Sequence, residues 1–374
     1  MAEIQLASAS AKQVWQNQYF AEYVRLSGYR DYMTNTNNGN KSGIILTRYD
    51  QLQKEAGTTI NIPFIGRLKS MGVTGSSVLD GQEESLTNFN CPIAIDWRRN
   101  GVRVPKSESF KTEIDLWNAA KDMLKTWEAE KVRDDITNAF GAVVTDLAGT
   151  TVNFGAASAA QRNYWLAANS DRVLFGGAKS NFSATWSAAV ANVTTASGKV
   201  TAAQASLMKR MAKLADPHIR PYKTETGREF FVAFHGTRSF RDMKLDATII
   251  AANTNARARE GDAMDKNPLF QDGDILYDGV IHHEVPEIDA WSTSTGLLDG
   301  AGGAGADVRP VFFCGTGAAG IAWGQMPTMR TDLIKDYGFR PGVAIEELLG
   351  IKKINFNGVQ NGMVTAFVAA AADS

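Results

Sequence analysis

The stretch Ser107–Val143, SESFKTEIDLWNAAKDMLKTWEAEKVRDDITNAFGAV, is the longest helical pattern in the chain. Neither Gly nor Pro interrupts it before Gly141. We expect about 32 residues of helix, roughly 48 Å long at 1.5 Å per residue, whereas globular helices average about 11–12 residues. The pattern predicts a spine helix that runs along the whole subunit. Apolar residues at three- and four-residue spacing define its core face: Phe110, Ile114, Trp117, Leu124 and Trp127.

Residues 57–105, just before the spine helix, predict an extended two-stranded tongue. Apolar residues alternate in two segments that flank about 25 residues rich in Gly, Ser and acids, and this alternation is typical of strands with one covered face. The strand that holds Pro63 is expected at an edge, because proline lacks an N–H. Asn100-Gly101 is a hairpin signal, so the second strand either turns there or continues to Val104. The alternating residues are Ile60, Ile62 and Phe64, then Ile93, Ile95 and Trp97.

Two strands are too few to hold a core of their own, so the tongue must lie on something else. It either folds back on its own domain or lies across a neighbouring subunit. We hypothesise the second arrangement, in which the six alternating side chains make inter-subunit contacts. On that hypothesis Ile62→Asp or Ile95→Asp blocks assembly and leaves the subunit folded.

Residues 1–56 are expected to form an N-terminal arm. A helical pattern runs from Ala11 to Leu26, with Trp15, Tyr19 and Tyr23 spaced four apart, and a polar breaker follows at residues 35–40. The aromatic row fits either a helix docked on its own core or an arm packed on a neighbour.

The rest of the chain mixes helices and strands without regular βαβ alternation, which indicates an α+β fold. Thr201–Leu214 predicts a helix that opens with a Thr201-x-x-Gln204 capping box. Val343–Leu349 fits a short helix or a strand. Ile351–Phe356 and Met363–Ala369 predict a closing hairpin around Asn357-Gly358. The other predicted strands are Val173–Phe175, Phe230–His235, most of Ile275–Glu284, and Val308–Cys314.

Composition excludes several classes of protein. The 374 residues are 44% hydrophobic and 21% charged, which indicates a folded chain. The net charge is -1 at pH 7, without the concentrated positive charge that tight binding to nucleic acid requires. Cys91 and Cys314 lie far apart, so we expect neither a disulfide framework nor a zinc site, and synthesis in a reducing cytoplasm. We expect neither a signal peptide nor a membrane span.

One sequence motif resembles a cofactor-binding fingerprint. Gly315–Gly320, GTGAAG, matches the GxGxxG fingerprint of dinucleotide-binding enzymes and follows a predicted strand. A helix must begin at such a turn, but Gly324 and Pro327 soon interrupt the sequence. A glycine-rich turn between strands is therefore favoured. Adjacent His282 and His283 point to opposite faces of a strand and do not chelate one ion. We expect no catalytic residue, cofactor or metal.

The order of the segments resembles the major capsid proteins of tailed bacteriophages, in particular those of N-four-like podophages. The resemblance covers most of the chain except residues 146–170 and 286–307. Gly236 stands after His235, where we expect Pro in that family. The segments that carry the resemblance are residues 56–63 (AGTTINIP), 73–84 (VTGSSVLDGQEE), 116–135 with LKTW at 124–127, 172–176 (RVLFG), 231–235 (FVAFH) and 340–358.

This resemblance implies the Hong Kong 97-type capsid fold and a division of the chain. The arm would be 1–56 and the extended loop 57–105. The peripheral domain would be 106–245, with the spine helix at 107–143 and an insertion near 146–200. The axial domain would be 246–342, and 343–374 would return to the peripheral domain.

The resemblance also implies a function. Pentamers and hexamers of the chain would tile the icosahedral head of a virion around packaged double-stranded DNA. A separate scaffolding protein and a portal would be partners, DNA would be contacted weakly and non-specifically, and a decoration protein is possible in such shells. Three alternatives stay open at this point: an encapsulin-like compartment, a tail or decoration protein, and a dinucleotide-binding enzyme that uses Gly315–Gly320.

Overall fold

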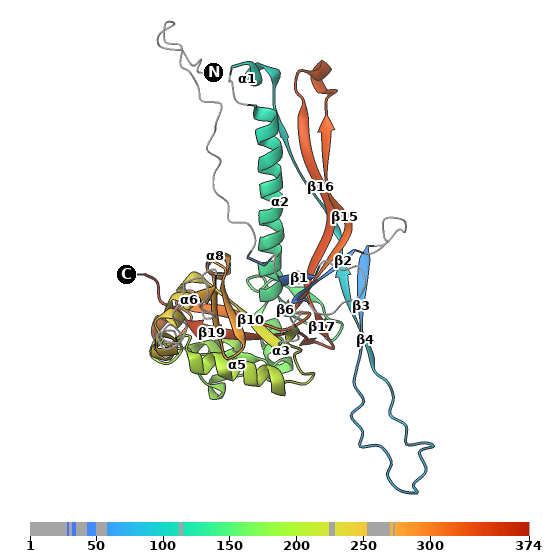
Figure 1. The fold of residues 1–374 in the computed structure, drawn as a ribbon, viewed down its shortest axis with the longest axis vertical. Helices are drawn as coiled ribbons and strands as arrows, with labels where there is room; N and C mark the ends of the chain where they lie inside the picture. The colour runs from blue at the N-terminus through green and yellow to red at the C-terminus, as the bar shows by residue number, and fades with distance from the viewer. Residues whose placement is uncertain are drawn as a thin grey trace, which may run out of the picture.

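The computed structural model describes residues 28–29, 32–34, 43–49, 58–111, 115–223, 229–252, 270–271 and 274–373. Within these residues a compact domain lies at the foot of one long helix, a long hairpin runs beside that helix, and a thin tongue projects away from both (Figure 1). The predicted helix Ala11–Leu26 and the breaker at 35–40 lie outside the described residues, as does Ile114.

The spine helix α2 spans Leu116–Gly141, 26 residues, and is shorter than expected. The reason is Asp115, whose carboxylate accepts hydrogen bonds from the backbone N–H groups of Trp117 and Asn118 and so caps the helix. The predicted start at Ser107 is wrong. Phe110 lies on a separate short helix, α1 (Lys106–Lys111), and is 94% exposed, so it is not part of the spine core.

The inner face of α2 packs on a long antiparallel hairpin. Leu124 is buried against Val343 and Ile345 of β16, and the half-buried Trp117 and Trp127 pack on this cluster. The hairpin belongs to a five-stranded sheet with the order β1-β2-β15-β16-β5. Its strands are β1 (Met33–Thr34), β2 (Ile45–Tyr49), β15 (Ala319–Asp332), β16 (Gly342–Lys353) and β5 (Asp96–Arg103).

The end of the expected arm joins this sheet. Strand β2 pairs in parallel with β15. Tyr29, Ile44 and Ile45 are fully buried in a cluster that also contains Phe140 of α2. This part of the region 1–56 therefore docks on its own subunit.

The tongue is built from β3 (Thr59–Ile65) and β4 (Asn88–Ala94), which pair antiparallel from Thr59 with Ala94 to Ile65 with Asn88. The second predicted strand divides here, because Trp97 falls on β5 in the other sheet. Strand β5 continues through Asn100-Gly101 and pairs with β16. The chain therefore forms no hairpin turn at Asn100-Gly101.

The compact domain is organised around an eight-stranded sheet. Seven of its strands follow the order β11-β12-β13-β10-β14-β19-β8, and the eighth, β9, pairs with β10. Helices pack around it (Figure 1). The strands are β8 (Val173–Phe175), β9 (Tyr222–Lys223), β10 (Glu229–His235), β11 (Phe270–Gln271), β12 (Asp274–Tyr277), β13 (Val280–Glu284), β14 (Val308–Cys314) and β19 (Met363–Ala369). The helices are α3 (Ala159–Ala168), α4 (Trp186–Ala191), α5 (Ala202–Leu214), α6 (Thr237–Lys244) and α8 (Glu287–Ser294), with short 3-10 turns at Lys179–Asn181 and Gly303–Gly305. A third 3-10 turn, Lys335–Gly338, lies outside this domain, between β15 and β16.

Alternation along the central strands divides the core into two faces. Phe231 and Phe313 point into a cluster that contains α5. Val232, Phe234 and Phe312 point to the opposite face, where the foot of α2 supplies Ile136 and Phe140. A period of two places successive side chains on opposite sides of a sheet, so the spine helix is anchored in the core of the compact domain.

Several predicted elements are confirmed. Strands β8, β10 and β14 lie where expected, β16 resolves the ambiguity at Val343–Leu349 as a strand, and the α+β class is confirmed. Helix α5 starts after Thr201, whose side chain accepts a hydrogen bond from the N–H of Gln204.

Two expectations differ from the structure, and one long strand had no predicted bounds. Asn357-Gly358 does form a turn, but it joins β17 (Asn355–Phe356) to β18 (Val359–Gln360), whereas Met363–Ala369 pairs with β14 and β8. The long strand β15 was not predicted. Two of the expected domain boundaries each fall between two strands of one sheet. The boundary at 245/246 separates β10 from β14, and the boundary at 342/343 separates β15 from β16.

Candidate assembly interface

The root of the tongue packs on its own subunit. Ile60 and Ile93 are 1% exposed and form a cluster with Ile95 and Ala322 of β15. Ile62 is half-buried against this cluster. The hypothesis that these side chains reach a neighbouring subunit is therefore wrong for Ile60, Ile93 and Ile95. Two strands cannot exclude water from their apolar face, and the hairpin β15-β16 already covers it.

Phe64 also contacts its own subunit. Its ring stacks on that of Phe356, with centroids 4.5 Å apart, while the side chain stays half-buried. Trp97 is different, because it lies on β5 and is 52% exposed. Of the six predicted contact residues, Trp97 is the most available to a partner.

The root of the tongue packs closely against two glycines of the hairpin β15-β16. A Cβ added at Gly350 would stand 1.9 Å from the carbonyl oxygen of Ala94, and one at Gly320 would stand 2.9 Å from Cδ1 of Ile93. A side chain at Gly350 would push the tongue backbone off the hairpin, whereas one at Gly320 would displace the end of the Ile93 side chain. Gly320 is the last residue of the GxGxxG motif, so the motif has a packing role that sequence reasoning did not find.

The same motif is the turn between β14 and β15. Gly317 has a φ of +72°, a conformation that favours glycine. A strand follows it instead of a helix, so no helix N-terminus is available for a phosphate. The expected turn between strands is confirmed and the dinucleotide-binding interpretation is not supported.

The tongue tip, residues 66–87, exposes five large apolar side chains to solvent. Met71 is 100% exposed and Val78 is 74% exposed. Sequence reasoning missed this feature because it looked for alternation. The available signal was the presence of large apolar residues inside a Gly- and Ser-rich loop, where no core exists to receive them. The exposed residues are Leu68, Met71, Val78, Leu79 and Leu86.

Polar contacts shape the tip and tether it. The Glu84 carboxylate accepts hydrogen bonds from the backbone N–H groups of Lys69 and Ser70, at 2.7 and 2.6 Å, and these bonds hold the pKa of Glu84 below its usual range. Lys69 Nζ and Arg67 pair with Asp216 of the compact domain at 2.7 and 3.5 Å. The hydrogen bond from Lys69 lowers the pKa of Asp216.

A second apolar surface lies at the opposite end of the molecule. The distal tip, residues 333–341, joins β15 to β16 and lies beside α1, where the N–H of Lys106 donates to the carbonyl of Phe339 at 3.0 Å (Figure 1). Ile334 and Tyr337 are almost fully exposed there, as is Phe110 of α1. Asp336 and Tyr337 adopt positive φ values of 56° and 51°, which non-glycine residues seldom adopt.

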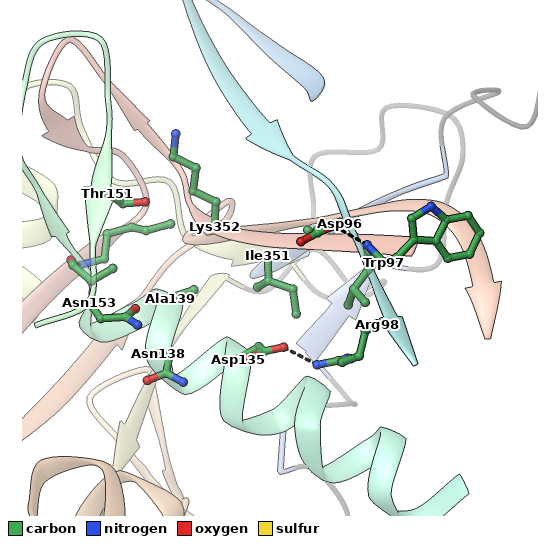
Figure 2. A pocket seen from close by; sticks show the side chains of 14 residues that line it. Asp96, Trp97, Arg98, Asp135, Asn138, Ala139, Thr151, Asn153, Ile351 and Lys352 are labelled. Carbon is green, nitrogen blue, oxygen red and sulfur yellow. Dashed lines mark hydrogen bonds and ion pairs between the residues drawn. The ribbon is translucent and has the colours of Figure 1, made fainter. Parts of the chain in front are cut away.

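A cavity of about 440 Å³ with both polar and apolar lining residues lies where α2 meets β5 and β16. Figure 2 shows Arg98 of β5 and Asp135 of α2 at its edge, joined by an ion pair of 2.5 Å. Lys353, which also lines it, is almost completely buried and donates to the Ala142 carbonyl at 2.7 Å. Burial lowers the pKa of Lys353 to about 7.

The histidines do not converge on one point. His282 Nδ1 lies 2.8 Å from His235 Nε2, while His283 Nδ1 lies 2.7 Å from Asp274, so adjacent histidines point to opposite faces as expected. Burial lowers the pKa of His282 to about 3. Over the described ranges, no group of three or more His, Cys, Asp or Glu side chains is placed to hold a metal ion. None of the helices described is both long and apolar enough to cross a membrane.

The shape of the molecule is that of a shell-forming coat protein: a spine helix beside a hairpin, a compact domain at its foot, and a projecting tongue with an uncovered apolar tip. The comparisons with known proteins agree. A family described as phage capsid protein matches residues 3–369, and the chain belongs to this family. The major capsid protein of Pseudomonas phage KPP25 is 26% identical over 357 residues, which are 89% of each chain.

Solved structures show the same fold. The capsid asymmetric unit of cyanophage Pam1 is 45% identical, covers 100% of both chains and has a TM-score of 0.88. The capsid of Ralstonia phage GP4 is 19% identical, with a TM-score of 0.72 over 100% of this chain and 99% of that one, and it supports the fold alone. The chain has the Hong Kong 97-type fold and is a major capsid protein of a tailed bacteriophage. The compartment, tail and enzyme alternatives are not favoured.

Proposed function

We propose that the tongue tip is the main contact by which each subunit holds its neighbour in the icosahedral shell, and that the distal tip makes a second contact. The observation that carries this proposal is the exposure of five large apolar side chains on residues 66–87. Monomeric proteins seldom expose contiguous apolar surface, and larger patches mark interaction sites. A second copy of the chain is the expected partner, because a shell repeats one subunit.

The two apolar surfaces lie at opposite extremes of an elongated subunit (Figure 1). Two separated contacts let one subunit join two others, which a closed shell of pentamers and hexamers requires. On this proposal the compact domain, residues 142–314 with 354–373, lies around the axis of each pentamer or hexamer. The spine helix and hairpin then form the peripheral domain.

Membership of the phage capsid family supports a proposal of further partners. A separate scaffolding protein directs assembly, a portal occupies one vertex, and a decoration protein has the outer surface available. Contact with packaged double-stranded DNA is weak and non-specific on this proposal, because a net charge of -1 does not favour tight binding to phosphates. Synthesis takes place in the cytoplasm of the host bacterium.

Negative-stain electron microscopy tests the proposal. The chain is expressed with its scaffolding protein and compared with Met71→Asp, which places a charge at the tongue tip, and Leu214→Asp, a matched change at an exposed residue of α5. We expect closed shells from the parent chain and from Leu214→Asp, and folded but unassembled subunits from Met71→Asp. Normal shells from Met71→Asp would show that the tongue tip is not the main contact.

A further inference from the structure

Three carboxyl groups lie near one guanidinium where the spine helix crosses the hairpin, and two of them are bonded to it. Arg98 of β5 donates from Nε to Glu347 of β16 and from Nη1 to Asp135 of α2, both at 2.5 Å. Glu128 stands two turns before Asp135 on α2, so it lies on the same face of the helix. Leu124, one turn before Glu128, packs with Ile345, two residues before Glu347 on β16, so Glu128 and Glu347 face each other across the interface. Each carboxyl group shifts the pKa of the other.

A hydrogen bond between two carboxyl groups requires a proton on one of them, because ionised carboxylates only accept. Glu347 is 1% exposed, and its Oε2 receives no hydrogen bond from a nitrogen or hydroxyl donor of the described residues. Three ionised carboxylates around one guanidinium would leave two uncompensated charges. Burial, followed by the Glu347 charge, raises the pKa of Glu128 to about 7. Burial also raises the pKa of Asp135 and of Glu347.

The other charged groups nearby do not neutralise this excess. Lys131 of α2 faces Asp135 but lies 3.8 Å from Asp134, so the two charges offset each other. Glu346, the residue before Glu347 on β16, is paired with Arg330 of β15 at 2.7 Å. The cluster is also open to proton exchange, because Arg98 and Asp135 line the cavity in Figure 2.

We propose that Glu128, Glu347, Asp135 and Arg98 form a proton-dependent clamp that holds the spine helix to the hairpin in mildly acidic solution and loosens above neutral pH. The shared proton joins α2 to β16. When it leaves, the carboxylates of Glu128 and Glu347 repel each other across that interface. The folded state binds this proton more tightly than the unfolded chain does, so the stabilisation is present at low pH and is lost as pH rises through the raised pKa. The clamp is independent of the contacts proposed for the tongue.

Hydrogen exchange followed by mass spectrometry tests the clamp on the purified full-length subunit. Glu128→Gln keeps a neutral donor opposite Glu347 at every pH. Glu130→Gln is the matched control, because Glu130 lies on the same helix but faces Arg133 at 3.9 Å. Comparing variants at one pH cancels the intrinsic pH dependence of exchange. At pH 8.5 we expect peptides from 124–135 and 343–349 to exchange about tenfold faster in the parent chain than in Glu128→Gln.

At pH 5.5 the parent chain and Glu128→Gln should be equally protected, and Glu130→Gln should follow the parent at both values. Equal exchange in the parent and Glu128→Gln at pH 8.5 would overturn the proposal. If Glu128→Gln does not fold, the parent chain alone gives the answer. The protection of 124–135 relative to helix α3, 159–168, must then fall between pH 5.5 and 8.5, and a constant ratio would overturn the clamp.

Discussion

A methyl group added to Gly350 would stand 1.9 Å from the carbonyl oxygen of Ala94, so the backbones of β16 and the tongue touch at this point. No rotation of a side chain relieves such a contact, because the obstructing atom belongs to the backbone. The direction in which the tongue leaves the subunit therefore depends on a residue about 260 positions away in the chain.

Gly350→Ala should lift the tongue root off the hairpin. We expect a loss of about 2–3 kcal/mol in the free energy of unfolding, typical of overpacking against rigid atoms, measured by urea denaturation. Gly342→Ala in the same strand is the control. Its added Cβ would meet Arg103 Cγ at 3.5 Å, an ordinary contact, so its stability should change by no more than about 0.5 kcal/mol. Equal effects from both variants would disprove the role given to Gly350.

Ile60→Asp should destabilise the subunit itself and not only its assembly. Ile60 is 1% exposed, and an unpaired carboxylate there, together with the lost packing, should cost at least about 3 kcal/mol. Ile65 lies on the same strand but is 63% exposed, so Ile65→Asp should leave the urea midpoint unchanged. A parent-like midpoint for Ile60→Asp would mean that the tongue root does not pack as described.

Asp216→Asn should free the tongue without destabilising the fold. The ion pairs of Asp216 with Lys69 and Arg67 are largely exposed, and such pairs contribute little to global stability. We expect trypsin to cleave faster after Arg67 and Lys69 in this variant, at an unchanged urea midpoint. Asp278→Asn, which removes the partner of Lys209 in the compact domain, should not alter cleavage of the tongue. Unchanged cleavage in Asp216→Asn would argue against the tether.

Lys353 should make stability rise with pH above neutrality. Its pKa is lowered to about 7 by burial, so between pH 7 and about 10 the unfolded chain holds a proton that the folded chain releases. Lys353→Met removes this dependence of stability on pH. The variant also loses the hydrogen bond from Lys353 Nζ to the Ala142 carbonyl, and that loss lowers the free energy of unfolding by the same amount at every pH. Relative to the parent, Lys353→Met should therefore be more stable at pH 6.5 than at pH 9, by on the order of 2 kcal/mol. An equal stability difference at the two pH values would contradict this account.

The fold was predictable where local rules act alone. Thr201 and Gln204 gave the start of α5, and the strong pattern at 116–141 gave the spine helix. The start of that helix was missed because Phe110 and Ile114 continue the apolar spacing, whereas the helix is capped at Asp115. Strand β15 was missed because Gly324 and Pro327 are poor strand formers, and register shifts in its pairing with β16 accommodate this segment.

The interface was only half predictable. Alternation identified a covered face at Ile60 and Ile93, but it could not say which surface covers that face, since the partner strands are more than 200 residues away. The carboxyl clamp was also beyond sequence reasoning, because Arg98, Glu128 and Glu347 come from three separate elements. Only the three-dimensional structure brings such groups together.

A cryo-electron microscopy reconstruction of the assembled shell tests the central claim most directly, because it locates Met71 and Val78 relative to the next subunit. The account predicts that both side chains, exposed in the single chain, are buried against a neighbouring copy. A closed shell in which the tongue tip stays in solvent would contradict it.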